Sequence, residues 1–455
     1  MFILSMIGKL LRPPSREMAA LMGDRRLLHF GHLASMAVMI RFVILWIFAA
    51  SAVAQELSIP IGEIKDDEVR LVQICNEMKE ALREFYPAVD AIEDANEQEK
   101  YFRERDPSLV YVQKLVDFEK LHRGTQAGLM AVRRLVLSAD LGERTNTRYL
   151  GRREALRALP AYANNEVLPE ILRYLSSGKP DVTSETCLRE IVTESVLEQN
   201  RLFAQYMLAR WILESRDGRT FCEQRLDAIS VGAKLRFPKE KDQLIDILAA
   251  GISKDRIPEL EKEAETLLML VANSNSTTRQ PAVVGADENW HIIRLDKKKT
   301  ETMPLIREVA SGLLFVERHL RVGKRAPELD VKLVNNTHWS ISGNQGKTLI
   351  IQFSFKGCGP CEEMYPDLRA LAQQYADKLS ILTITADSNL ADTTETVETG
   401  KITWNVAWDG SRGPVATRWA VDAFPEVYVI APDGTVAGIG LRGDDLREKI
   451  AQLVK

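Results

Sequence analysis

The sequence lacks the excess of basic residues that nucleic-acid-binding proteins usually carry, since 60 lysines and arginines face 64 aspartates and glutamates. It is also poor in glycine and proline, with 26 and 18 among 455 residues, which excludes a collagen-like or low-complexity chain. Its five cysteines are too few to hold a chain of this size together by disulfides. We therefore expect a globular protein of at most about three domains with no nucleic-acid partner.

The sequence also lacks a clear membrane-spanning run, which needs about 20 apolar residues. Its most apolar stretch, residues 42–54 (FVILWIFAASAVA), is shorter, follows Arg41 and ends in the small residues Ala52 and Ala54. A basic flank, a short apolar core and a small-x-small exit are typical of a secretory signal. We expect cleavage after Ala54, with an uncleaved N-terminal anchor as the alternative.

We therefore assign residues 1–54 to a signal peptide or N-terminal anchor. The first 35 residues contain more basic side chains than export needs, so we expect translation to start at Met36 or Met39. The mature protein would then be exported to the periplasm or cell envelope, where disulfides can persist. Membrane anchoring follows only if the segment stays uncleaved.

Residues 55–320 have the pattern of a mainly α-helical region, whose function the sequence does not reveal. Apolar residues recur three and four positions apart, as on one face of an amphipathic helix: Val69, Val72, Cys75, Met78, Leu82 and Phe85. Residues 273–278 (NSNSTT) read as a polar loop, and residues 304–320 as one further helix.

Residues 321–455 change to an α/β pattern. Short β-rich runs alternate with amphipathic segments, which predicts a central sheet flanked by helices. The expected strands are 348–355, 379–385, 426–431 and 435–439, and the expected helices are 360–376, 393–399, 413–420 and 444–454.

Two of the five cysteines, Cys358 and Cys361, lie three positions apart where the first strand gives way to a helix. A Cys-x-x-Cys pair at such a junction is typical of a redox dithiol. The helix N-terminus favours an anion at Cys358 and so a nucleophilic thiolate, to which Lys356 would add if its ammonium faced the sulfur. Cys361, one turn later, is placed to resolve a mixed disulfide, and Pro360 is tolerated in a first helical turn.

The cysteines also allow other interpretations. A zinc site needs more thiolates or imidazoles than this pair, and the six histidines form no close pair at ligand spacing, so we expect no metal. A static structural disulfide remains an alternative for Cys358 and Cys361. Cys75, Cys187 and Cys222 are expected to be buried free thiols, although the sequence leaves a Cys187–Cys222 disulfide open.

The C-terminal third resembles the thioredoxin-like superfamily, in its exported TlpA/ResA-type branch, which is related to the AhpC/TSA and redoxin families. The residues that carry the resemblance lie between Val322 and the C-terminus. They are the lead-in VGKRAPEL from Val322, the Gly346-Lys347 pair, the Cys358-Gly359-Pro360-Cys361 motif, Ala423-Phe424-Pro425 before Val427, and Pro432-Asp433-Gly434.

The resemblance implies a cis peptide bond at Pro425, facing the dithiol and shaping a substrate groove with Phe424, Gly359 and Pro360; a trans proline ending a loop is the alternative. It also implies that Asp387 helps to move protons, although this residue could instead cap a helix. Trp404 and Trp408 are expected to pack in the core.

The chain departs from the family at two positions near the dithiol. Gly357 replaces the usual tryptophan before the first cysteine, and Gln352 replaces the buried carboxylate of thioredoxin itself. These departures leave the dithiol intact, but they affect what the resemblance implies about proton transfer to the sulfurs and about the redox potential.

These observations predict an exported thiol–disulfide oxidoreductase that acts on protein thiols and disulfides. Cys358 would be the nucleophile and Cys361 the resolving thiol, with no organic cofactor because the sulfurs carry both electrons. A membrane protein would supply or accept those electrons. Two alternatives stand beside this one. The first is a peroxiredoxin-like peroxidase. Its family carries a Pro-x-x-x-Thr/Ser-x-x-Cys pattern, but this chain has Ile351 in place of the proline and Phe355 in place of the threonine or serine. The second is a helical interaction or scaffold protein with a redox-inactive domain.

Overall fold

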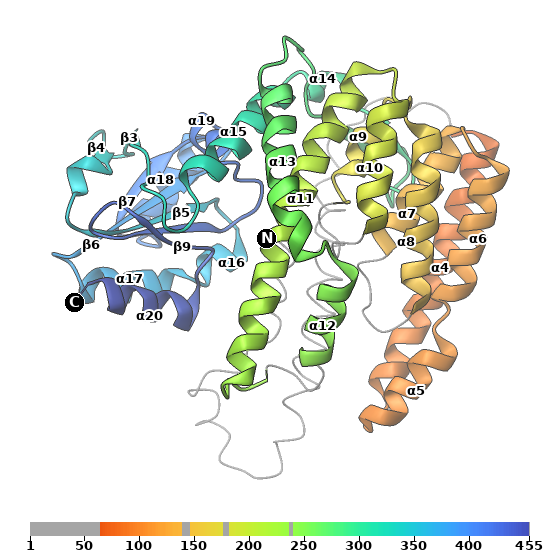
Figure 1. The fold of residues 1–455 in the computed structure, drawn as a ribbon, viewed down its shortest axis with the longest axis horizontal. Helices are drawn as coiled ribbons and strands as arrows, with labels where there is room; N and C mark the ends of the chain where they lie inside the picture. Colours follow the sequence, from red (N-terminus) through yellow and green to blue (C-terminus); the bar gives the residue numbers. More distant parts are fainter. Residues whose placement is uncertain (1–63, 139–145, 176–181, 236–239, 455) are drawn as a thin grey trace. The chain divides into compact units, whose positions relative to one another are not determined.

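The computed structural model describes residues 64–138, 146–175, 182–235 and 240–454 (Figure 1). The expected signal segment, residues 1–54, lies outside these ranges. No helix in the described ranges is both long enough and apolar enough to cross a membrane. The chain divides into two units. The helical unit has two segments, one that runs to Ala264 and a second, Arg279–Met303. The C-terminal unit comprises the intervening segment Glu265–Thr278 and the chain from Pro304 onward.

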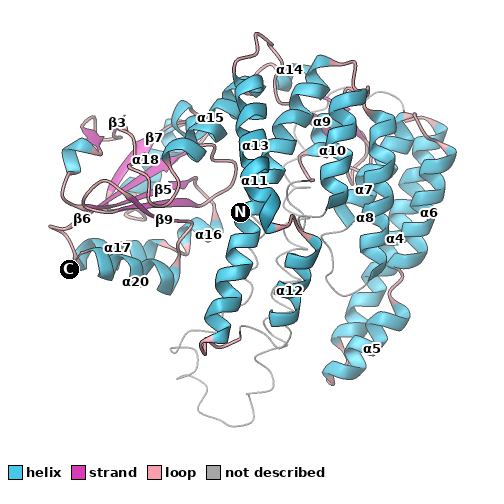
Figure 2. Ribbon diagram, in the orientation of Figure 1, coloured by secondary structure: helices cyan, strands magenta, loops and turns pink. Residues whose placement is uncertain are grey.

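The helical unit is built of packed helices, as the sequence predicts (Figure 2). Helix α4 packs against α6 and α7, α7 against α8, and α10 against α11. The helices are α4 (Asp66–Asp90), α5 (Ala95–Arg105), α6 (Ser108–Leu121), α7 (Gln126–Ser138), α8 (Asn146–Ala158), α9 (Leu168–Leu172), α10 (Val182–Glu194), α11 (Glu198–Ser230), α12 (Glu240–Ala250), α13 (Ile257–Ala272), which continues into the C-terminal unit, and α14 (Lys297–Thr300).

Two details of the helical unit differ from expectation. The buried stripe of α4 includes Leu71 and Ile74, whereas Val69, which we placed on that stripe, is 54% exposed. In addition, the antiparallel strands β1 (Val283–Gly285) and β2 (Ile293–Leu295) form a hairpin that we did not predict. Strands of three residues are too short for a period-2 pattern to be recognised.

The C-terminal unit is centred on a five-stranded mixed sheet in the order β7-β6-β5-β8-β9. Strands β5, β6 and β7 are parallel, and β8 and β9 are antiparallel neighbours of β5 and of each other. All seven residues of β5 and of β6 are buried, which explains their continuous apolar character. The strands are β5 (Thr348–Ser354), β6 (Leu379–Thr385), β7 (Asn405–Trp408), β8 (Glu426–Ile430) and β9 (Val436–Ile439); β3 (Asp330–Lys332) and β4 (His338–Ser340) pair separately.

Helices cover both faces of this sheet, so the thioredoxin-like arrangement expected from the sequence is confirmed (Figures 1 and 2). One face packs against α17 and α20, through a cluster that includes Leu368, Leu446 and Ile450. The other packs against α15 and α19, through a cluster that includes Phe353 and Trp419. The helices are α15 (Ile306–His319), α16 (Gly359–Glu362), α17 (Tyr365–Gln374), α18 (Leu390–Glu398), α19 (Pro414–Arg418) and α20 (Gly443–Leu453).

Helix α15 packs with the sheet-containing unit, whereas we ended the helical region at residue 320. Gly312 lies so close to α19 that a Cβ atom there would collide with the carbonyl oxygen of Thr417. The guanidinium of Arg418 lies 4.3 Å from the centre of the Phe315 ring. The α15 pattern identified a helix but could not show which unit its apolar face contacts.

Candidate redox site at Cys358 and Cys361

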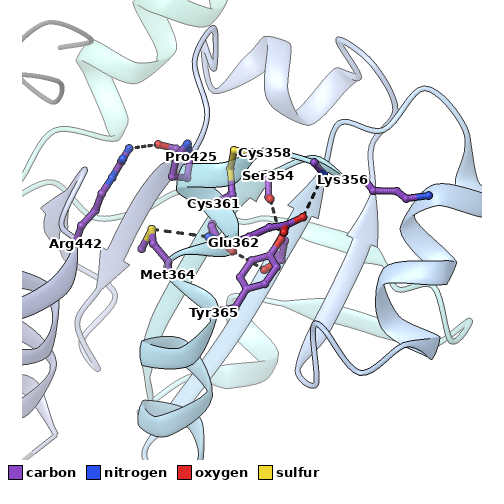
Figure 3. Close-up of a disulfide and its surroundings, with 12 residues drawn as sticks. Ser354, Lys356, Cys358, Cys361, Glu362, Met364, Tyr365, Pro425 and Arg442 are labelled. Atoms are coloured by element: carbon purple, nitrogen blue, oxygen red, sulfur yellow. Dashed lines mark hydrogen bonds between the residues drawn. A yellow bond between two sulfur atoms is a disulfide. The ribbon is translucent and has the colours of Figure 1, made fainter. Parts of the chain in front are cut away.

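The two cysteines form a disulfide where β5 leads into α16, with their Cα atoms 5.2 Å apart (Figure 3). Cys358 is the N-cap residue of α16, and its carbonyl accepts hydrogen bonds from the backbone N–H groups of Cys361 and Glu362, both at 3.0 Å. Cys358 is 4% exposed and Cys361 is fully buried. The first cysteine is therefore the more accessible of the two.

Two helices, α16 and α17, follow in place of the single helix predicted for residues 360–376. Pro366 lies in the first turn of the second helix. Because proline has no N–H group, it cannot donate the hydrogen bond that would continue α16. Met364 and Tyr365, at the split, turn toward the sheet and are buried.

The peptide bond between Phe424 and Pro425 is cis, as the resemblance implied, and Pro425 lies beside the disulfide (Figure 3). Arg442 donates a hydrogen bond from Nη2 to the carbonyl oxygen of Pro425, at 2.6 Å. Burial lowers the pKa of this guanidinium to about 10. The sequence does not predict this role of Arg442, because nothing in the local pattern connects the N-cap residue of α20 with a proline loop 17 residues away.

The Lys356 side chain points away from the disulfide (Figure 3). Its Nζ atom lies 2.8 Å from a carboxylate oxygen of Asp392 and 2.9 Å from one of Glu395. These hydrogen bonds raise the pKa of Lys356, and the bond from Lys356 lowers the pKa of Asp392. The ammonium therefore does not meet our condition that it face the sulfur.

Asp387 is buried and fixes the loop that leads to Cys358. Its carboxylate accepts hydrogen bonds from the Lys356 backbone N–H and from the Thr393 hydroxyl, both at 2.7 Å. The helix cap that we considered for Asp387 is provided instead by Asn389, whose side chain accepts from the Asp392 N–H. Asp387 thus holds the polypeptide two residues before the first cysteine.

A set of hydrogen-bonded polar side chains connects β5 and β6. Gln352 donates to the sulfur of Met364 at 3.9 Å and accepts from the Thr383 hydroxyl at 3.0 Å. Thr383 in turn accepts from the indole N–H of Trp404 at 2.9 Å. The side chain at the position where thioredoxin carries a carboxylate is therefore held by neutral partners.

The other three cysteines, Cys75, Cys187 and Cys222, are buried and form no disulfide, so the Cys187–Cys222 pairing that the sequence left open does not occur. Burial raises the pKa values of Cys75 and Cys222 to about 11, which keeps both thiols protonated near neutral pH. Among the described residues, no group of three or more His, Cys, Asp or Glu side chains is arranged to hold a metal ion.

Comparison with known proteins places this site in a known family. Residues 322–439 match the AhpC/TSA family. The chain is 22% identical over 123 residues to the thioredoxin-like protein YneN of Bacillus subtilis, a match covering 26% of this chain and 71% of YneN. It is 25% identical over 136 residues to the thiol-disulfide oxidoreductase ResA of Oceanobacillus iheyensis, covering 29% of this chain and 70% of ResA.

Solved structures with similarity to the C-terminal part include the thioredoxin domain of a thiol-disulfide oxidoreductase from Bacteroides vulgatus. That domain has 24% sequence identity and a TM-score of 0.28, and the match covers 30% of this chain and 99% of the domain. A thiol:disulfide interchange protein from Chlorobium tepidum has 20% identity and a TM-score of 0.27, with 30% of this chain and 98% of that chain covered.

The family match, the ResA-type relatives and the dithiol at the strand-to-helix junction identify the C-terminal part as a thioredoxin-like redox domain. Its enzymatic class is that of a thioredoxin-like oxidoreductase. Because the family match begins at residue 322 and does not include the helical unit, the function of the whole chain is a matter for proposal.

Proposed function

We propose that this chain is an exported oxidoreductase that exchanges the Cys358–Cys361 dithiol or disulfide with cysteines of other proteins. The observation that carries the proposal is the disulfide at the junction of β5 and α16, with the cis peptide of Pro425 beside it. The resemblance to ResA, whose name describes thiol–disulfide exchange, supports it.

In this reaction Cys358 acts first, because it is the more accessible sulfur and lies at a helix N-terminus. Its thiolate attacks one sulfur of the partner disulfide and forms a mixed disulfide, while the other partner sulfur leaves and takes up a proton. Cys361 then loses its proton and attacks the sulfur of Cys358. The partner disulfide becomes two thiols, and the dithiol becomes the Cys358–Cys361 disulfide. Two electrons and two protons are transferred, and the reverse sequence oxidises a partner.

The partner's backbone is positioned by the residues that surround the sulfurs. Gly359 and Pro360 are exposed, and a Cβ atom added at Gly359 would meet no other atom within 4 Å, so a polypeptide can approach Cys358 there. Phe424 and Pro425 border the other side, and Arg442 holds the Pro425 carbonyl. A second dithiol or disulfide protein, in the membrane if the chain is exported, restores the starting redox state.

A trapping experiment tests the exchange reaction. In the full chain, Cys361→Ser leaves the mixed disulfide at Cys358 without a resolving thiol, so covalent adducts with partner proteins should accumulate and disappear on reduction. Cys358→Ser is the matched control, and we expect few adducts because Cys361 is fully buried. The wild-type chain should also reduce insulin. Absence of both adducts and insulin reduction would favour the scaffold alternative, and reduction of hydrogen peroxide alone would favour the peroxidase.

Export is tested separately. The relatives and the redox chemistry fit a compartment outside the cytoplasm, and the segment at residues 42–54 is the expected signal. N-terminal sequencing of the protein from an envelope fraction should find Gln55 as the first residue. Detection of Met36 or Met39 at the N-terminus of membrane-bound protein would instead show an anchor, and recovery from the cytosol alone would contradict export.

A further inference from the structure

Two buried hydroxyl groups lie near the disulfide and have no part in the exchange steps described above. Ser354 is the last residue of β5 and is fully buried, and Tyr365 is the first residue of α17 and is 6% exposed. Their oxygen atoms are 3.1 Å apart, and Figure 3 shows the Tyr365 hydroxyl directed toward Ser354, whose side chain lies beside Cys361. We call Ser354 and Tyr365 the hydroxyl pair.

The path of the chain explains why this pair lies beside the resolving cysteine. Cys361 and Tyr365 are four residues apart, and both Glu363 and Met364, which join α16 to α17, have helical backbone angles. Side chains four residues apart in a helical turn lie on the same face. Because Tyr365 reaches Ser354 from that face, Cys361 is directed toward the same end of β5.

The Tyr365 ring is held in place by the aromatic residue beside it. It packs edge-on against Trp404, with ring centroids 5.8 Å apart, and the Trp404 indole N–H donates to the Thr383 hydroxyl at 2.9 Å. The Tyr365 hydroxyl is therefore already ordered and loses little conformational entropy when it acts. Trp404 packs against the core as expected, whereas the same expectation for Trp408 was wrong, because that side chain is 41% exposed.

The hydrogen bond of the pair leaves one proton without an acceptor. Among the residues that the structure describes, neither hydroxyl has a hydrogen-bond partner besides the other. Burial raises the pKa of Tyr365 above its ordinary value of about 10, so the phenol keeps its proton and can donate it near neutral pH. When Tyr365 donates to Ser354, the proton of the serine hydroxyl is free to point to a third group.

That third group forms when the dithiol reacts. A disulfide sulfur is a weak acceptor, whereas a thiolate carries a full negative charge and binds donors strongly. Cys361 is fully buried, so water cannot solvate its thiolate, and burial alone disfavours the charged form. The nearby amide of Gln352 is already bonded to Met364 and Thr383. A donor that can stabilise a Cys361 thiolate is therefore provided by the hydroxyl pair.

We propose that the hydroxyl pair stabilises the Cys361 thiolate during the resolving step, with Ser354 donating to the sulfur and Tyr365 donating to Ser354. The Cys361 proton passes to water, the new thiolate attacks Cys358, and the bond from Cys358 to the partner sulfur breaks. The partner sulfur leaves with the electron pair and takes up a proton, while both hydroxyls end unchanged. Ser354 acts on the reacting sulfur directly, and Tyr365 is a positioning residue that acts through Ser354. This inference rests on the proposed exchange function and concerns the rate of its second step.

An aromatic disulfide separates the two steps in the reduced, full-length chain. The Cys358 thiolate attacks dithiobis(nitrobenzoate) and releases a first coloured aryl thiolate, and Cys361 then displaces a second one from Cys358. Two electrons pass from the dithiol to the reagent. The rate of the second release does not depend on reagent concentration, so it measures the resolving step alone. The other three thiols are buried and contribute only a slow, later signal.

Loss of either hydroxyl should slow the second release and leave the first unchanged. We expect the second release at pH 7 to be about tenfold slower in Ser354→Ala, with its pH midpoint about one unit higher, because a hydrogen bond to a charged group is lost. Tyr365→Phe keeps the ring against Trp404, and it should slow the second release severalfold in the same direction. Ser354→Thr retains a hydroxyl and should recover much of the rate. Tyr375→Phe is the matched control, because its hydroxyl accepts only from the exposed Gln374, and it should change neither release.

The outcomes separate this inference from the exchange function. If the wild-type chain gives neither release, the exchange function itself is wrong. If both releases occur and the variants keep the wild-type rate and pH midpoint of the second one, the hydroxyl-pair inference is overturned and the exchange function stands. Equal slowing of both releases in Tyr365→Phe and Ser354→Ala would also overturn it, since a general distortion of the site would then explain the loss.

Discussion

The guanidinium of Arg442 donates a hydrogen bond to the carbonyl oxygen of Pro425, 2.6 Å away, and so connects the start of α20 with the cis-proline loop beside the dithiol. A hydrogen bond from a charged donor is stronger and shorter than one between neutral groups. The hydrogen bond fixes the Pro425 carbonyl against α20, and we infer that the rest of the loop can contact a partner. Arg442 is thus a positioning residue in the proposed exchange.

Replacement of Arg442 should weaken partner docking more than it weakens the chemistry. In Arg442→Met, we expect KM for a protein disulfide to rise about tenfold, equivalent to 1.4 kcal/mol, with kcat nearly unchanged. The Cys358–Cys361 midpoint potential should stay within experimental error. Arg442→Lys should recover part of the lost affinity, since lysine still offers a charged donor.

Arg447→Met provides the control for that experiment. Arg447 lies on the same helix but pairs with Asp367 and Asp444 instead of the proline loop. A rise in KM of equal size in both variants would show that the effect comes from α20 as a whole and not from the contact with Pro425.

Asp387 gives a second prediction, on proton handling. Because its carboxylate accepts the Lys356 N–H and the Thr393 hydroxyl, we infer that it positions the loop before Cys358. Asp387→Asn retains one acceptor oxygen, so the pH profile of disulfide exchange should keep its shape. Asp387→Ala removes the acceptor of the part-buried Lys356 N–H and one of the two partners of the Thr393 hydroxyl, which also lies 2.7 Å from Thr385 Oγ1. The lost hydrogen bonds, worth about 0.5–1.5 kcal/mol each, should lower the unfolding midpoint. A shifted pH profile in Asp387→Asn would instead establish a role in proton transfer.

The sequence predicted the parts of this site that local chemistry determines. The Cys-x-x-Cys motif, placed after a buried β-rich run, indicated the dithiol at a strand-to-helix junction, and the resemblance indicated the cis bond at Pro425. Continuous apolar runs identified β5 and β6 because both faces of these strands are buried.

The remaining features depend on contacts between distant segments, which a single sequence does not encode in a recognisable pattern. Arg442 reaches Pro425 only because β9 returns beside β8. Trp408 is a large aromatic residue of the kind usually found in a core, but it is the last residue of an edge strand and is 41% exposed. From the sequence, the Lys356 ammonium could face either the dithiol or nearby carboxylates. In the structure it pairs with Asp392 and Glu395, which α18 brings close to it.

The docking of α15 gives a third prediction. In Gly312→Ala, the added Cβ would collide with the Thr417 carbonyl, so α15 and α19 must move apart. Overpacking of this kind typically costs about 1–3 kcal/mol. Hydrogen–deuterium exchange of the full chain should become faster in peptides from both helices. Ser311→Ala is the control, since Ser311 is exposed on the same helix and its replacement should change exchange little.

The last prediction concerns Glu426, which directly follows Pro425. Its Oε1 atom is buried and has no hydrogen-bond partner among the described residues. Burial, with a further contribution from Asp422, raises the pKa of this carboxyl from 4.5 to about 8. The folded protein therefore holds a proton that the unfolded chain has released, and stability must fall as pH rises through the interval between the two values. The decline contributed by one such group is at most about 1.4 kcal/mol per pH unit.

Removal of the titrating group should abolish that part of the decline. Glu426→Gln mimics the protonated carboxyl, so its urea midpoint should match the wild-type value near pH 4 and exceed it increasingly from pH 5 to pH 8. Glu363→Gln, at an exposed position on the short turn after the dithiol, should follow the wild-type curve throughout. If the Glu426→Gln and wild-type curves run parallel over this interval, Glu426 titrates alike in the folded and unfolded chains. Its carboxyl would then have to be in contact with water in the folded protein.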